Sequence, residues 1–149
     1  MRRLAAPLAV LLLAACPAST YFNPPPATRF FYPTGVVHVD AQGSDAGFLF
    51  VANANWNRLY ASGSISAVDL DRVPGFPAFG APVDGGPAEL KDLGGPQTIQ
   101  VNTFTGELAS LALAPGKVRL FVPSRSEGMK FQAVDARFAD GGVDLSCFP

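Results

Sequence analysis

The chain has 149 residues, of which 48% are hydrophobic and 15% charged, and its formal net charge at pH 7 is -1. Beyond Arg2 and Arg3, the Lys and Arg residues are scattered singly and form no basic stripe, so the sequence predicts no nucleic-acid partner. It contains no glycine-rich phosphate loop, nucleophile elbow or His-Glu-x-x-His pattern. We therefore predict no enzyme activity and no cofactor.

The first 15 residues have the layout of an export signal. Arg2 and Arg3 precede an apolar run, residues 4–15, that is too short to cross a bilayer as a helix. The run ends in Leu-Ala-Ala followed by Cys16, a pattern that resembles the lipobox of bacterial lipoproteins. The resemblance implies cleavage before Cys16 and acylation of its thiol, which would anchor the protein to a membrane of the bacterial cell envelope, expected to be the outer membrane. An ordinary cleaved signal with an incidental cysteine is the alternative.

Residues 16–32 are predicted to be the lipidated cysteine and a Pro-rich tether. Three consecutive prolines, residues 24–26, favour extended polyproline geometry and would space the folded part from the lipid. Phe30, Phe31 and Tyr32 end this stretch, and we expect the three rings to fill the core at the entry to the first strand, with a binding platform as the alternative.

Residues 33–107 are predicted to form a first antiparallel sheet unit. Three short segments are rich in β-branched and aromatic residues and are bounded by Gly, Asp, Asn or Ser, namely 36–39, 48–53 and 65–70. Residues 97–102 alternate polar and apolar side chains, which indicates a fourth strand at a half-exposed edge. Between them, residues 73–96 are interrupted by Pro and Gly and are predicted to be a surface insertion.

The strand pattern returns once, in residues 108–149. Leu-Phe-Val occurs at residues 49–51 and again at 120–122, and a Val-Asp pair ends the third strand of each copy. A repeat made of strands points to stacked β-sheet units. We expect Phe50 and Phe121 to be equivalent and buried between sheets, and we expect the second unit to be truncated.

Residues 50–53, Phe-Val-Ala-Asn, are similar to the Tyr-Val-Thr-Asn signature of the YVTN repeats of bacterial β-propellers, and residues 33–39 resemble the segment before it. In the second copy, Pro123 and Ser124 replace the last two residues of the motif. The resemblance implies an all-β fold of antiparallel four-stranded blade-like sheets, a partial β-propeller of about two units. Two units leave apolar faces open, so we expect self-association, a partner chain or further blades to cover them.

The loop after the second strand is the candidate ligand-facing surface, because loops on rigid sheets carry recognition and Trp and Tyr are favoured contact residues. The residues predicted to face a ligand are Asn55, Trp56, Asn57, Tyr60 and Arg125. The structural alternatives are that the Asn side chains support turns, that Trp56 covers a sheet edge, and that Arg125 forms a solvated ion pair with Glu127.

Two classes of function remain open at this point. The favoured hypothesis is a lipid-anchored envelope protein with a propeller-like binding or scaffold module that contacts a protein or glycan. The alternatives are part of a propeller enzyme, a lyase or hydrolase whose active site lies outside this chain, and a nonfunctional gene fragment. Low charge content and a single histidine, His38, favour the binding module. No metal site is predicted, because Asp69 and Asp71 lack the regularly spaced oxygen ligands of a calcium loop.

Overall fold

The structure is a computed structural model that describes residues 23–73, 97–126, 129–139 and 142–148. The predicted signal peptide, Cys16, the first part of the tether and nearly all of the insertion lie outside these residues. Within the described part of the chain, no helix is long and apolar enough to cross a membrane.

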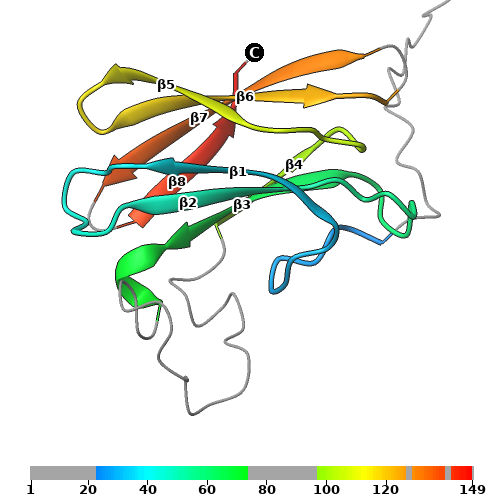
Figure 1. The fold of residues 1–149 in the computed structure, drawn as a ribbon, viewed down its shortest axis with the longest axis horizontal. Coiled ribbons are helices and arrows are strands. Elements are labelled where there is room, and N and C mark those ends of the chain that lie inside the picture. Colours follow the sequence, from blue (N-terminus) through cyan, green and yellow to red (C-terminus); the bar gives the residue numbers. More distant parts are fainter. Residues whose placement is uncertain (1–22, 74–96, 127–128, 140–141, 149) are drawn as a thin grey trace, which may run out of the picture.

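Two antiparallel four-stranded sheets form the fold and stack face to face (Figure 1). In chain order, the first sheet contains β1 (Pro33–Val39), β2 (Phe48–Asn53), β3 (Gly63–Asp69) and β4 (Gln97–Val101), and the second contains β5 (Ala109–Ala114), β6 (Lys117–Ser124), β7 (Lys130–Ala139) and β8 (Gly142–Cys147). A short 3-10 helix, η1 (Leu70–Arg72), follows β3. The prediction of an all-β fold with antiparallel four-stranded sheets is confirmed. β8 supplies a fourth strand to the second sheet, where we had expected a truncated unit.

The two sheets repeat each other in register and in strand order. Phe50 pairs with Ala67 in the first sheet, and Phe121 pairs with Ala133 in the second. The first strands of the two sheets, β1 and β5, also contact each other across the stack, and so do the last strands, β4 and β8. The second sheet therefore follows the first with its strands in the same order, so residues at equivalent positions point in the same direction.

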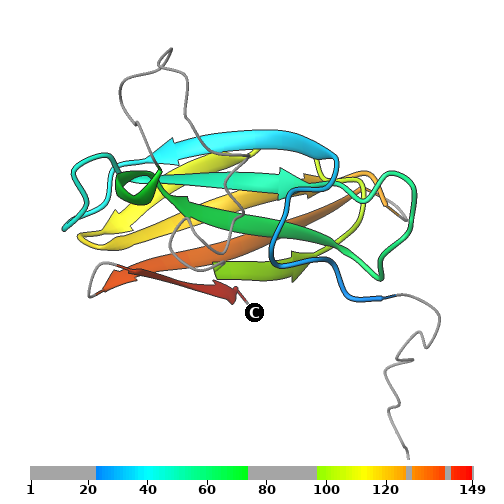
Figure 2. The same ribbon diagram turned by 90° about the horizontal axis from the view of Figure 1, so that it is seen from below.

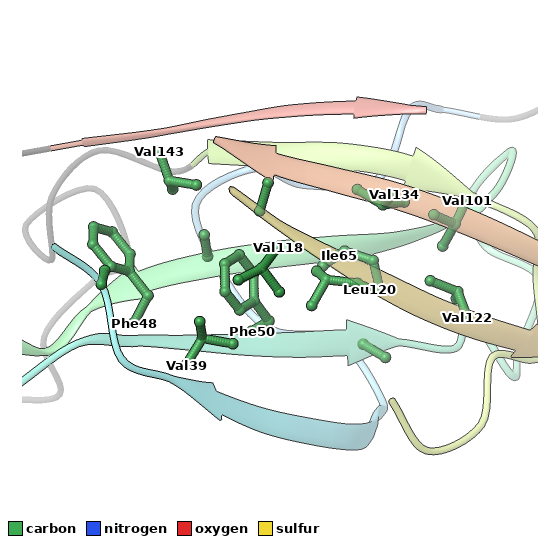
Figure 3. Packing of buried hydrophobic residues seen from close by; sticks show 14 residues of the cluster. Val39, Phe48, Phe50, Ile65, Val101, Val118, Leu120, Val122, Val134 and Val143 are labelled. Carbon is green, nitrogen blue, oxygen red and sulfur yellow. The ribbon is translucent and has the colours of Figure 1, made fainter. Parts of the chain in front are cut away.

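An apolar layer between the sheets forms the core. Figure 3 shows side chains of both sheets pointing into this layer, including Phe50 and Ile65 from the first sheet and Leu120 and Val134 from the second. Burial alternates strictly along β6, as the two-residue period of a strand requires when one face is covered. The prediction that Phe50 is buried is confirmed, since its ring is 0% exposed.

Phe121, in contrast, is only partly buried, and the prediction that it lies between the sheets is wrong. Its ring is on the outer face of the second sheet, with its centroid 5.7 Å from that of the exposed Phe131. The reason is the direction of stacking. A residue that faces the neighbouring sheet from the first unit faces away from it at the equivalent position of the second unit.

The entry segment is attached to the folded part, which corrects part of the tether prediction. Asn23 forms a bridge with Tyr60, its carbonyl accepts a 2.9 Å hydrogen bond from Ala61 N–H, and Pro25 is buried. Of the three aromatic residues expected in the core, only Phe31 is buried, with its ring 4.8 Å from that of Tyr60. Phe30 and Tyr32 are exposed, so only one of the three rings contributes to the core.

The connections fall at two opposite ends of the stack. We call one of them the loop end: it contains residues 54–62 between β2 and β3, residues 102–108 between β4 and β5, and the described residues of the β6–β7 loop, 125–126 and 129 (Figure 2). The other end contains the β1–β2 loop and η1.

Asp71 organises the end opposite the loop end. Its carboxylate accepts hydrogen bonds from Ser44 Oγ, Asp45 N–H and Ala46 N–H at 2.8 to 2.9 Å. The bond from Ser44 is the largest cause that lowers the pKa of this carboxyl. Asp69 caps η1 by accepting from Asp71 N–H and pairs with Arg72. Both aspartates therefore act in turns.

Candidate functional site

The loop of residues 54–62 owes its shape to Asn55. Its side-chain Nδ2 donates to the Tyr60 carbonyl at 2.7 Å, and its Oδ1 accepts from Tyr60 N–H at 3.2 Å. Its backbone has a φ of 54°, a left-handed conformation that Asn tolerates better than most residues. Asn55 is 0% exposed, so the prediction that it faces a ligand is wrong: it closes the loop from inside.

Asn57 and Tyr60 support the same loop from its surface. Asn57 is exposed, accepts from Leu59 N–H through Oδ1 and donates from Nδ2 to the Tyr32 hydroxyl, both at 3.3 Å. Tyr60 is half-buried, and its hydroxyl accepts from Arg29 Nη2 at 3.1 Å. Both side chains therefore hold the entry segment against the loop while keeping part of their surface accessible.

Phe104 joins the loops of the two sheets. Its N–H donates to the Ala54 carbonyl at 2.6 Å, and its carbonyl accepts from Arg125 N–H at 3.1 Å. Its ring lies edge-on to the Trp56 indole, with centroids 5.1 Å apart, and the Arg58 guanidinium lies 5.2 Å from the ring centroid. Trp56 and Arg58 are thus positioned by the link between the sheets.

The residues that follow Phe104 are also held against β1. Thr34 Oγ1 donates to the Thr105 carbonyl at 2.9 Å. Gly35 permits the close approach that follows, because a Cβ at that position would lie 2.5 Å from the Gly106 carbonyl oxygen. The loop end is therefore held by hydrogen bonds and close backbone packing from both sheets.

All five non-glycine residues that have a positive φ in the described part of the chain lie at the loop end or in the entry segment bonded to it. They are Tyr32, Asn55, Arg58, Phe104 and Met129, with φ between 49° and 55°. Such conformations each cost on the order of 1–3 kcal/mol, and they gather at sites where a fixed geometry has a use.

A cleft of about 360 Å³ lies between the loop of residues 54–62 and the β6–β7 loop. Three cations line it, Arg58, Arg125 and Lys130, together with polar groups of Asn102 and Ser126. None of the described lining residues is acidic, and within the described residues these three cations form no ion pair. We call this the basic cleft; a concave surface lined by one sign of charge attracts the opposite sign.

An apolar hollow of about 600 Å³ adjoins the basic cleft. Its apolar lining is Trp56, Phe104, Pro123, Met129 and Phe131. Met129 is 83% exposed and Phe131 66% exposed, which is unusual for large apolar side chains gathered in one place. Phe104, Arg125 and Lys130 line both the cleft and the hollow, so the two spaces share a border.

The structure brings together three of the five predicted site residues. Trp56, Tyr60 and Arg125 line the cleft or the hollow, while Asn57 lies in the same loop and supports it. Sequence reasoning missed Arg58, Phe104, Met129, Lys130 and Phe131. A usable signal was present for the cations, since Arg58, Arg125 and Lys130 all follow the ends of repeat-equivalent strands β2 and β6.

A cluster of ion pairs lies away from the loop end. Asp135, on the outer face of β7, accepts from Arg119 Nε at 2.7 Å and lies 2.9 Å from Lys117 Nζ. The hydrogen bond from Arg119, followed by that from Lys117, lowers the pKa of Asp135 to about 2. The cluster therefore carries its own counter-charges. Across the described residues there is no group of three or more His, Cys, Asp or Glu placed to hold a metal ion.

The fold and the site define a class: an all-β protein of two stacked sheets that presents a basic cleft and an apolar hollow at one end. Comparisons with protein-family models, with curated proteins and with solved structures found no match for the chain.

Proposed function

We propose that this is a lipid-anchored protein of the bacterial cell envelope, attached to the outer membrane through an acylated Cys16, and that its propeller-like module binds a partner through the loop end. The proposal of an anchor rests on the lipobox-like sequence before Cys16. The proposal of a YVTN-type module rests on the motif at residues 50–53 and on the repeated register of the two sheets.

One observation carries the binding role. Loops from both sheets meet at Phe104, where they form the basic cleft and the apolar hollow side by side. Exposed Trp56, Met129 and Phe131 are costly to keep in water, and the positive-φ residues add backbone strain. A protein that needed only a stable fold would gain from replacing them, so a binding surface is the function that best accounts for their presence together.

The open face of the second sheet supports a scaffold role beside ligand binding. Phe121, Phe131 and Ala133 occupy there the register positions that Phe50, Ile65 and Ala67 occupy on the inner face of the first sheet. The inner face of the first sheet holds a second sheet against it. The outer face therefore has part of the pattern needed to hold another sheet, and we propose that a second copy of this chain associates there.

Photo-crosslinking tests the binding role. The full chain is made in a bacterial host that processes lipoproteins, with benzoyl-phenylalanine in place of Trp56. Illumination of intact cells should give a discrete crosslinked species. The matched control carries the same group in place of the exposed Gln42, in the β1–β2 loop at the opposite end. Crosslinking that is equal at both positions, or missing at position 56, would contradict the proposal.

A further inference from the structure

We infer that the loop end recognises a short acidic segment of a partner protein, in which a carboxylate side chain stands close to a large apolar side chain. This inference rests on the proposed function, because it names the class of ligand for the same surface. The carboxylate would occupy the basic cleft, and the apolar side chain would fill the hollow beside it.

The positive charge of the basic cleft predicts an anionic group on the ligand. Arg58, Arg125 and Lys130 reach it from two loops and from the start of β7. An Arg side chain binds a carboxylate with two parallel hydrogen bonds, which gives geometric specificity as well as energy. Asn102 and Ser126 supply further polar groups beside the cations. The cleft is therefore complementary to an anion rather than to a neutral or cationic group.

The apolar hollow predicts a large apolar side chain on the same ligand. Its walls come from Trp56 in a loop of the first sheet, and from Met129 in a loop and Phe131 on β7 of the second sheet. Methionine is unbranched and adapts to differently shaped apolar partners, which suits a surface that receives a side chain. Removal of apolar surface from water is favourable, so a large apolar side chain seated between Trp56, Met129 and Phe131 adds to the affinity of a short segment.

The lining of the hollow favours a peptide over an acidic glycan. Sugars are held by planar polar groups, such as side-chain amides and carboxylates, around an aromatic face. Among the described residues that line the hollow there is no Asn or Gln, and Glu107 is the one carboxylate. Pro123, Met129 and Phe131 instead offer apolar side chains next to the cations.

The test is a selection of random displayed heptapeptides on the full lipidated chain in detergent micelles, with counter-selection on the double variant Arg58→Glu, Arg125→Glu. Enriched peptides should contain Asp or Glu within two residues of Phe, Trp, Leu or Met. For a labelled peptide from the selection, Arg125→Glu and Met129→Ser should each raise the dissociation constant about tenfold or more. The matched control is Arg137→Glu, which makes the same charge change at an exposed position on β7, away from the cleft.

Each remaining outcome overturns the inference. Absence of enrichment, enriched sequences that lack acids, or equal affinity for the double variant would show that the cleft does not bind an acidic segment. Saturable binding of oligogalacturonate that is lost in Arg125→Glu, with no peptide enriched, would reassign the site to an acidic glycan. In that last case the photo-crosslinking at position 56 would still succeed, so the proposed binding role would stand while the peptide inference fell.

Discussion

Phe50 and Phe121 occupy the same register position in the two sheets, yet Phe50 is fully buried between the sheets and Phe121 lies on the outer face, partly exposed and 5.7 Å from the ring of Phe131. Equivalent residues therefore have different surroundings. The difference arises because the second sheet repeats the strand order of the first instead of facing it as a mirror image.

Truncation of these two rings should have unequal effects on stability. Phe50→Ala removes a buried side chain between the sheets and is expected to lower the free energy of unfolding by about 3–5 kcal/mol. Phe121→Ala removes a ring that already contacts water, so we expect a loss of roughly 1 kcal/mol or less. Urea unfolding of the acyl-free chain and both variants measures the difference; equal losses would contradict the direction of stacking.

The Asp135 cluster predicts a pH dependence at the acid end. Its folded pKa, about 2, is below the value of about 3.9 expected in an unfolded chain. The ionised form is therefore favoured by folding, and its contribution to stability is complete above about pH 4 and is lost as the pH falls toward 2. Asp135→Asn should be less stable at pH 7 and should lose less stability over that interval. Urea midpoints across the interval compare the two; parallel curves would rule out this role for Asp135.

The open face of the second sheet should determine self-association. Leu111 on β5 is 51% exposed on that face, and Leu111→Ser removes its apolar contact. Leu59 in the loop of residues 54–62 is 61% exposed and lies on neither outer sheet face, so Leu59→Ser provides the matched control. Sedimentation velocity of the acyl-free chain should show association that increases with concentration in the parent and in Leu59→Ser, and weaker association in Leu111→Ser. A monomeric parent would refute the proposed contact between copies.

Acylation is expected at one of the two cysteines. Cys16→Ser should leave an unprocessed precursor and abolish labelling with radioactive palmitate, because the acyl chains are attached to that position after processing. Cys147, which is exposed and forms no disulfide in the structure, provides the control. Cys147→Ser should be labelled as strongly as the parent. Labelling that persists in Cys16→Ser would end the lipoprotein proposal.

Strand positions were largely predictable from the sequence, whereas the roles of individual side chains were not. Residues 48–53 match β2 completely, because aromatic and β-branched content and flanking turn residues are local properties of the sequence. The role of Asn55 could not be predicted, since its two hydrogen bonds to Tyr60 depend on the closed shape of the loop. The hollow was missed for a similar reason: Trp56 and Phe131 are distant in sequence and line the same hollow only because the sheets stack.

Oxidative footprinting tests the central claim, that the loop end is occupied by a partner in the cell. Hydroxyl radicals react readily with Trp56 and Met129, which are 51% and 83% exposed, and with His38, whose side chain is 47% exposed near the opposite end. Compared with the purified full chain, the chain in intact cells should show several-fold less oxidation of Trp56 and Met129 and unchanged oxidation of His38. Equal oxidation of all three residues in both states, or protection of His38 alone, would contradict the claim.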